Sequence, residues 1–177
     1  MQLSDLIKQL KTYARQEDIA KVKKAYAMAE RFHEGQVRAS GEAYIDHPLH
    51  TAYTLAELKL DSATIAAALL HDTVEDTDCS YDDIKKEFGK KVAELVEGVT
   101  KIGFLKSMTK EERHAASIRK VILASIKDIR IILIKLADRV HNMQTLSVFR
   151  QEKRQRIAGD ALEIYAPIAH KLGIATI

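Results

Sequence analysis

The stretch "AAALLHDTVEDT", residues 66–77, sets four ionisable side chains directly against a run of apolar residues. His71 and Asp72 end the apolar run, and Glu75 and Asp76 follow within one helical turn. An unpartnered carboxylate in a protein interior costs on the order of several kcal/mol, so such groups normally meet a cation, a metal ion or each other. The stretch therefore predicts a buried helix that ends in a polar site, with partners from elsewhere in the chain.

Apolar residues recur at steps of three and four along most of the chain, which is typical of amphipathic helices. The clearest example is residues 18–35, "DIAKVKKAYAMAERFHEG", where Gly35 suits a left-handed cap. Asp61 is placed to cap the quoted helix. Ser80 and Asp83 have the reciprocal spacing of another helix cap.

Residues 129–143, "IRIILIKLADRVHNM", are locally ambiguous, because isoleucine favours strands. No partner strand is evident, and the polar end of the segment continues at helical spacing, so a buried helix is predicted. Thr109 and Glu112 repeat the capping pattern ahead of a helix that reaches about Ile126. The chain closes with a helix that is expected to break before Pro167.

The helical pattern is interrupted at residues 36–48, "QVRASGEAYIDHP". Ser40 and Gly41 indicate a loop with room for a short hairpin, and Pro48 suits the first turn of the next helix. No repeat or low-complexity linker divides the sequence. We therefore predict an all-α fold, a helical bundle that occupies residues 1–177 as a single domain.

The composition is ordinary for a globular protein, with 177 residues, 46% hydrophobic and 30% charged. The longest apolar run is far shorter than the roughly 20 residues of a membrane-spanning helix, and the N-terminus lacks the layout of a signal peptide. Cys79 is the single cysteine, which excludes an internal disulfide and agrees with a reducing compartment. These features predict a cytoplasmic protein with no membrane partner and leave its oligomeric state open.

The net charge of +3 is too small to indicate nucleic-acid binding by itself. Residues 150–156, "RQEKRQR", form a local basic cluster, which we interpret as a solvated helix face rather than an RNA-binding surface. Aromatic residues make up 6% of the chain and offer little for base stacking. No nucleic-acid partner is therefore expected.

Two further residues suit the polar site. His47 precedes His71 by 24 residues, and Asp138 interrupts an apolar segment where a core residue is expected. With Asp72 they offer two imidazoles and two carboxylates, a nitrogen and oxygen set suited to Mn²⁺, Fe²⁺ or Zn²⁺. Spacing alone leaves other roles open: a helix cap for His47, a hydrogen-bonded core position for His71, and a salt bridge for Asp138.

The pair His71-Asp72, with a histidine upstream and an aspartate far downstream, resembles the HD superfamily of metal-dependent phosphohydrolases. The likeness is closer still to the hydrolase domain of the Rel/Spo family, which removes the 3′-diphosphate from the alarmone (p)ppGpp. Five segments match this family in order and spacing and cover nearly the whole chain: "GQVRASGEAYIDHPLHTA", "ALLHDTVEDTD", "FGKKVAELVEGVTKI", "IKLADRVHNMQTL" and "ALEIYAPIAHKLGI". The resemblance implies an HD-domain helical bundle with hydrolase activity.

The resemblance also implies a role for each residue of the polar site. Glu75 and Asp76 match an acidic pair assigned to the attacking water and its proton transfer. The metal ion, usually Mn²⁺ in this family with other divalent ions left open, would be held by four residues: His47, His71, Asp72 and Asp138.

Four residues match family positions around the nucleoside. Arg38 matches the arginine that lies against the nucleobase, and Ser40 belongs to the same pocket. Asn142 and Thr145 follow Asp138 by four and seven residues on one helix face, and match residues that contact the nucleoside. Without the family context they would be interpreted as caps and surface polar groups.

Two positions depart from the family pattern. Ala39 stands where lysine is frequent, and Gln144 stands where arginine is common. Both changes remove positive charge near the nucleotide. The resemblance therefore predicts the hydrolytic reaction, whereas the preference for guanine stays open.

The predicted reaction converts (p)ppGpp into GDP or GTP and pyrophosphate. Lys135, Arg139 or residues 150–156 are candidates to hold the outer phosphates. Two alternatives remain: an HD enzyme that acts on ppApp or NADPH, and a regulatory domain that binds nucleotide without cleaving it. Long members of the family continue into a synthetase domain, so the chain is either a free-standing hydrolase or the hydrolase part of a longer protein.

Overall fold

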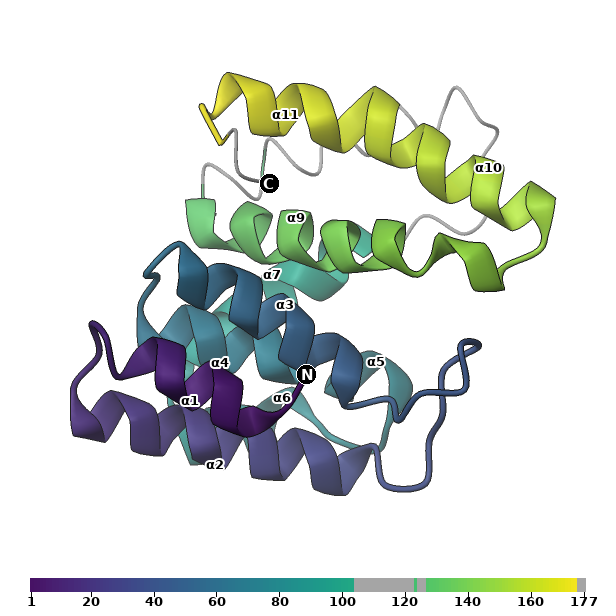
Figure 1. The fold of residues 1–177 in the computed structure, drawn as a ribbon. Helices are drawn as coiled ribbons and strands as arrows, with labels where there is room; N and C mark the ends of the chain where they lie inside the picture. The colour runs from purple at the N-terminus through teal and green to yellow at the C-terminus, as the bar shows by residue number, and fades with distance from the viewer. Residues whose placement is uncertain (104–122, 124–126, 175–177) are drawn as a thin grey trace.

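The computed structural model describes residues 1–103, 123 and 127–174, and its described elements are helices (Figure 1). The predicted cap at Thr109 and the helix that reaches about Ile126 lie outside the described residues. Within the described part, the predicted all-α fold is confirmed. In chain order the elements are α1 (Leu3–Leu10), α2 (Gln16–Phe32), α3 (Asp46–Glu57), α4 (Ser62–Leu70), α5 (Thr73–Asp76), α6 (Tyr81–Phe88), α7 (Lys90–Gly103), α9 (Ile129–Gln144), the 3₁₀-helix η1 (Leu146–Val148), α10 (Gln151–Asp160), the π-helix η2 (Ala161–Tyr165) and α11 (Ala166–Lys171).

Helix α4 lies at the centre of the bundle. Its residues from Thr64 to Leu70 are completely buried, because α2, α3, α7 and α9 all pack against it. A helix enclosed in this way is apolar on every side rather than along one stripe, which explains the continuous run "IAAALL". The buried helix predicted from the quoted stretch is therefore confirmed.

Side-chain caps define where two of the helices begin. The Asp61 carboxylate accepts a hydrogen bond from the backbone N–H of Thr64 at 2.8 Å, at the start of α4. Ser80 and Asp83 form the reciprocal cap at the start of α6. Each cap supplies a partner that the first helical turn lacks, and both match the sequence prediction.

Helix α9 contains the segment whose isoleucines favour a strand locally. It is capped by Asp128, and it buries Ile131, Ile132 and Ile134 against the bundle. Gly98 on α7 lets the two helices approach closely, since a Cβ atom there would overlap the Ile131 side chain. Tertiary packing overrides strand propensity here, and the predicted buried helix is confirmed.

The loop ahead of α3 folds back on itself. Val37 and Ala43 form an antiparallel bridge, and the backbone N–H of Tyr44 donates to the carbonyl of Gln36 at 3.0 Å. This pairing matches the short hairpin expected there and is too short to form a strand. Pro48 occupies the first turn of α3, where its missing N–H is not needed.

The C-terminal helices α10, η2 and α11 form a layer over α9, which lies between them and α3 (Figure 1). The predicted break before Pro167 is wrong, because the chain stays helical on both sides of this residue. Pro167 lies in the first turn of α11, directly after η2, where its missing N–H is not needed. Across the residues that the structure describes, no helix is both long and apolar enough to cross a membrane.

Candidate metal centre

Three helices bring the predicted metal ligands to one buried point. His47 lies in the first turn of α3, His71 ends α4, and Asp138 lies within α9; each is at most 4% exposed. One ligand atom from each residue lies within 4.8 Å of the others. We call these three residues, together with Asp72, the His–Asp cluster.

Asp72 completes the cluster from the start of α5. Its Oδ1 lies 3.0 Å from His71 Nε2, and its Oδ2 lies 3.7 Å from His47 Nε2. His47 Nε2 also lies 3.1 Å from Asp138 Oδ1. The structure thus brings together all four residues that the sequence analysis assigned to the metal.

The hydrogen bonds of His71 leave one ring nitrogen for a metal ion. Its Nδ1 lies 2.8 Å from the carbonyl oxygen of Ala68, and Nδ1 carries the proton because a carbonyl only accepts. Nε2 is buried and has no hydrogen-bond partner among the described residues, so it is the nitrogen that a metal ion would use, as the lone-pair donor of the neutral ring. An imidazole fixed by a backbone carbonyl, with its other nitrogen unpaired and facing carboxylates, is arranged as a metal ligand. The cluster fits a divalent ion.

His141, which the sequence analysis missed, holds His47 in place. The Nδ1 atoms of the two rings are 2.8 Å apart, so one of them donates to the other. Burial, with further contributions from His47 and His50, lowers the pKa of His141 to about 3, so this ring is neutral. When His47 offers Nε2 to a metal ion, its Nδ1 is the donor to His141. The available sequence signal is spacing, since His141 follows Asp138 by three residues on α9.

Asp138 is held as an anion. Its Oδ2 lies 2.9 Å from Lys135 Nζ, and its Oδ1 accepts a hydrogen bond from Asn142 Nδ2 at 2.6 Å. Burial opposes ionisation, but Lys135 and His47 together hold the pKa of Asp138 well below its usual range. The salt bridge that the sequence left open therefore exists, and it uses one carboxylate oxygen while the other faces His47.

Glu75 and Asp76 lie beside the cluster, on α5, and both are exposed. Desolvation raises the pKa of the Glu75 carboxyl. The shift of Asp72 is opposite: burial would raise its pKa, but the two histidines of the cluster lower it. Nearby carboxyls whose pKa values move apart can take different roles, one as a ligand and another in proton transfer.

Two of the residues assigned to the nucleoside are linked to the His–Asp cluster. Arg38 Nη2 donates to Asn142 Oδ1 at 3.0 Å, and Asn142 in turn donates to Asp138. Ala39 and Gln144, the two departures from the family pattern, are exposed. The structure therefore places Arg38 and Asn142 at the edge of the cluster.

The other two residues assigned to the nucleoside use their hydroxyl groups locally. Ser40 donates to the Glu42 carboxylate at 3.0 Å within the hairpin loop. Thr145 donates to the His141 carbonyl at 3.1 Å where α9 ends. These contacts lie in a loop and at the end of a helix, as expected from the interpretation of these residues as surface polar groups and caps that applies without the family context.

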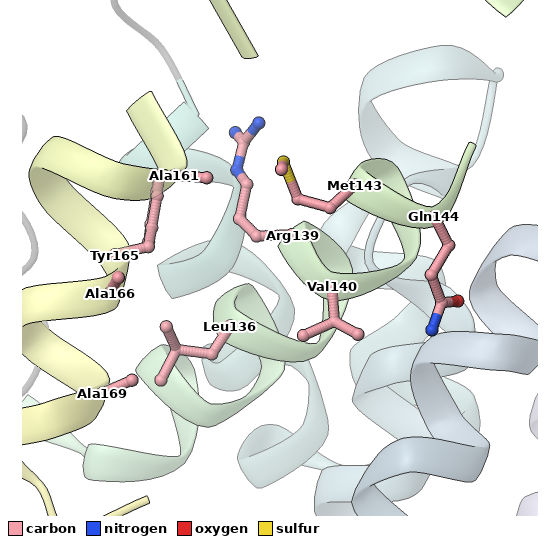
Figure 2. Close-up of a pocket in the computed structure, with 9 residues that line it drawn as sticks. All are labelled: Leu136, Arg139, Val140, Met143, Gln144, Ala161, Tyr165, Ala166 and Ala169. Atoms are coloured by element: carbon pink, nitrogen blue, oxygen red, sulfur yellow. The ribbon is translucent and has the colours of Figure 1, made fainter. Parts of the chain in front are cut away.

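The basic residues considered for the outer phosphates have other contacts. Lys135 is buried against Asp138. Arg139 reaches into a cavity of about 410 Å³ between α9 and the C-terminal helices, with its guanidinium carbon 5.1 Å from the centre of the Tyr165 ring (Figure 2). Residues 150–156 are exposed, as expected of a solvated helix face. None of these placements identifies the residue that would bind the outer phosphates.

A helical bundle that joins a histidine, a His-Asp pair and a distant aspartate at one buried point has the arrangement of an HD domain. The family model for the HD domain matches residues 25–175, so the chain belongs to the HD domain family, whose members are metal-dependent hydrolases.

Its relatives include the bifunctional (p)ppGpp synthase/hydrolase SpoT of Escherichia coli (strain K12), which is 54% identical over 175 residues. Guanosine-3′,5′-bis(diphosphate) 3′-pyrophosphohydrolase of Aquifex aeolicus (strain VF5) is 51% identical over 173 residues. Each match covers 98% of this chain, but 25% and 24% of the two relatives, so the chain spans about a quarter of their length.

A solved structure is similar as well. It is described as a metazoan ortholog of SpoT that hydrolyzes ppGpp and plays a role in starvation responses. The two structures agree with a TM-score of 0.69 at 30% sequence identity, over 88% of this chain and 97% of the other. The likeness therefore extends from the sequence motifs to the arrangement of the helices.

Proposed function

We propose that residues 1–177 form one HD-type hydrolase domain that removes the 3′-diphosphate of (p)ppGpp and releases pyrophosphate. The His–Asp cluster supports this most directly, because four potential ligands converge beside two exposed carboxylates. Relatives named for this activity match nearly the whole chain, which supports the choice of substrate class.

In this proposal the His–Asp cluster holds one divalent ion, and we favour Mn²⁺ because imidazole nitrogen and carboxylate oxygen together suit it. When bound, such an ion lowers the pKa of water and stabilises negative charge on phosphoryl oxygens. Lys135 keeps Asp138 ionised, and His141 orients His47. The protein thus fixes both the charge and the direction of its ligands.

Glu75 or Asp76 accepts the proton of the attacking water. The water oxygen bonds to the phosphorus attached to the ribose 3′-oxygen, the bond from this phosphorus to the 3′-oxygen breaks, and the 3′-oxygen takes up the proton that the carboxylate received from the water. The products are pyrophosphate and a nucleotide with a free 3′-hydroxyl, GDP from ppGpp or GTP from pppGpp. The raised pKa of Glu75 moves this carboxyl towards neutral pH, where proton transfer in both directions is efficient.

Arg38 offers a flat cation for the base, and Asn142 lies between it and the cluster. Stacking tolerates any base, and neither Ala39 nor Gln144 adds positive charge at this edge. These residues favour a second activity beside the first, the hydrolysis of ppApp or of another 3′-phosphorylated nucleotide such as NADPH.

A substrate panel tests the proposed reaction. The purified chain is incubated with Mn²⁺ and ppGpp, ppApp, GTP or NADPH in parallel, and the products are separated by anion-exchange chromatography. We expect pyrophosphate from ppGpp, a slower release from ppApp and none from GTP. Binding of ppGpp without turnover would instead favour a regulatory domain.

Two variants separate the chemical step from the binding of metal and nucleotide. Glu75→Gln and Asp76→Asn keep the size of each side chain but remove its charge, so turnover should fall by about a hundredfold or more while metal and nucleotide still bind. Glu87→Gln is the control, because Glu87 is a carboxylate of α6 that pairs with Lys24. Normal turnover in both variants would show that the two carboxylates are structural.

A further inference from the structure

Tyr44 joins two carboxylates that have different roles in the proposed reaction. Its hydroxyl group donates a hydrogen bond to Asp76 Oδ2 and lies 3.3 Å from Asp72 Oδ2. Asp72 belongs to the His–Asp cluster, whereas Asp76 is assigned to the water. The hydroxyl group therefore lies between the proposed metal ligand and the proposed proton acceptor. Because a phenol has one proton to donate, the hydrogen bond goes to Asp76.

The ring of Tyr44 is held on two sides. The His33 ring stacks on it, with centroids 4.3 Å apart and planes inclined by 12°. His33 is buried and contacts Gln36 Oε1 through Nδ1 at 2.9 Å. The guanidinium carbon of Arg38 lies 5.7 Å from the centre of the Tyr44 ring. The ring therefore connects the interior of the bundle to the residue that is proposed to cover the base.

A second contact ties the same loop to Asp76. Gln36 Nε2 donates to the backbone carbonyl of Asp76 at 3.2 Å, so the loop holds both the main chain and the side chain of this residue. The other carboxylate oxygen, Asp76 Oδ1, accepts no hydrogen bond from the described residues. This arrangement fixes Asp76 by one oxygen and leaves the other for a water molecule.

We propose that Tyr44 is a positioning residue, whose hydroxyl group holds the Asp76 carboxylate beside the metal ligand Asp72 and whose ring carries Arg38 at the nucleotide. The proposal rests on the proposed function, since it assigns Tyr44 through the roles of these neighbours. Tyr44 is not proposed to touch the reacting phosphorus or the metal. It acts through the carboxylate and the guanidinium group that it holds.

The substitution Tyr44→Phe tests the hydroxyl group, because it keeps the ring and its stacking. We expect kcat for ppGpp to fall by about ten- to a hundredfold with KM changed by less than about threefold, the pattern of a lost contribution to the chemical step. Tyr26→Phe is the matched control, since Tyr26 donates to Glu30 Oε1 at 3.0 Å within α2. A kcat for Tyr44→Phe within twofold of the control would overturn the proposal.

A double-mutant cycle shows whether the hydroxyl group acts through Asp76. In an Asp76→Asn background, Tyr44→Phe should lower kcat by less than about twofold, because the charge that it positions is already gone. A structural effect of the hydroxyl group would instead multiply with the loss at Asp76. Full multiplication of the two effects would therefore overturn the assignment.

The ring is tested by comparing Tyr44→Leu with Tyr44→Phe. Loss of the ring should raise KM for ppGpp at least about fivefold above the value for Tyr44→Phe, because Arg38 loses its support. Equal KM values in the two variants would overturn this part of the proposal. Circular dichroism and thermal melting identify any variant that has lost its fold.

Metal affinity keeps the test separate from the proposed function. Mn²⁺ binding to the metal-free protein, measured by calorimetry, should weaken by about tenfold in Tyr44→Phe and stay unchanged in Tyr26→Phe, since the hydroxyl group that lies 3.3 Å from Asp72 Oδ2 and orders this carboxylate is lost. This readout needs no substrate. Failure of the wild-type chain to hydrolyse any nucleotide would reject the proposed function, whereas unchanged Mn²⁺ affinity in Tyr44→Phe would reject the role of Tyr44 beside Asp72.

Discussion

Two charged clusters tie α4 to α9, and they differ in how their polar atoms are satisfied. The first, which we call the arginine cluster, lies where both helices begin and consists of Asp61, Lys91, Asp128 and Arg130. Arg130 donates to both aspartates, and each of the four carboxylate oxygens accepts a hydrogen bond. This cluster is complete without a ligand.

The His–Asp cluster lies at the other end of α4 and also contains two aspartates, but each of these faces a histidine. Its aspartates also have lowered pKa values, as Asp128 has in the arginine cluster. However, His71 Nε2 lies 3.0 Å from Asp72 without forming a hydrogen bond in the part of the chain that the structure describes. A low carboxyl pKa is therefore common to both clusters. The unpaired buried nitrogen of His71 is the feature that distinguishes the proposed metal site from the ion-pair cluster.

The largest effect should come from removing a ligand of the His–Asp cluster. We expect His71→Ala or Asp72→Ala to lower turnover of ppGpp by about a thousandfold or more, since the charge stabilisation supplied by the ion is lost with it. Asp128→Asn, in the arginine cluster, should leave turnover within about threefold of the wild type. Equal losses of activity at the two clusters would remove the distinction between them.

A smaller effect should follow at the edge of the His–Asp cluster. Arg38→Ala removes the hydrogen bond to Asn142 and the proposed stacking surface for the base, so substrate binding should weaken by about 1–3 kcal/mol, or roughly five- to 150-fold. Metal content should not change. Nucleotide affinity from a binding titration and metal content from elemental analysis check both parts, and a loss of metal would place Arg38 in the cluster itself.

The arginine cluster should lose its contribution to stability in acid. Hydrogen bonds from Arg130 hold the pKa of Asp128 below its usual range, so the ionised carboxylate stabilises the folded state above the unfolded pKa of about 3.9. Asp128→Asn keeps a capping oxygen but removes the charge, and should lower the free energy of unfolding by about 1–2 kcal/mol at pH 7.

The sign of this pH dependence follows from the lowered pKa. As the pH falls from about 4 towards the pKa of the folded state, Asp128 takes up a proton in the unfolded chain but stays ionised in the folded one, so its advantage over asparagine is progressively lost. Urea unfolding at a series of pH values measures this. A difference between wild type and variant that stays constant down to about pH 2 would mean that the Asp128 charge does not stabilise the fold.

The smallest expected effect concerns the choice of base. Ala39→Lys adds a donor beside Arg38 that can reach a guanine oxygen, so the ratio of kcat/KM for ppGpp to that for ppApp should rise by about three- to tenfold. The ratio compares two substrates on one protein, which removes effects of folding and metal content. An unchanged ratio would show that position 39 does not read the base.

Features that depend on near neighbours were predictable from the sequence. The caps at Asp61 and Ser80 need partners three residues away, and both were identified. Tyr44 and His141 were missed, because the contacts that define them join residues 32 and 94 positions apart. The break expected before Pro167 was wrong, since the proline lies in the first turn of α11, which follows η2 without an interruption of helical structure.

Identifying the four proposed ligands required both the sequence and the three-dimensional structure. Spacing alone left a cap, a core histidine and a salt bridge as alternatives, and the salt bridge from Lys135 to Asp138 is present in the structure. Only the three-dimensional arrangement shows that the second oxygen of Asp138 faces His47 while His71 Nε2 stays unpaired. The sequence could therefore identify the candidate residues. Which of their atoms remain unpaired depends on the three-dimensional fold.

The most direct measurement is a calorimetric titration of the metal-free protein with Mn²⁺, performed on the wild type, His71→Ala and Asp128→Asn. We expect one ion per chain in the wild type and in Asp128→Asn, accompanied by a higher melting temperature, and no comparable binding in His71→Ala. Absence of binding in the wild type, or equal binding in His71→Ala, would contradict the claim that a divalent ion completes the His–Asp cluster.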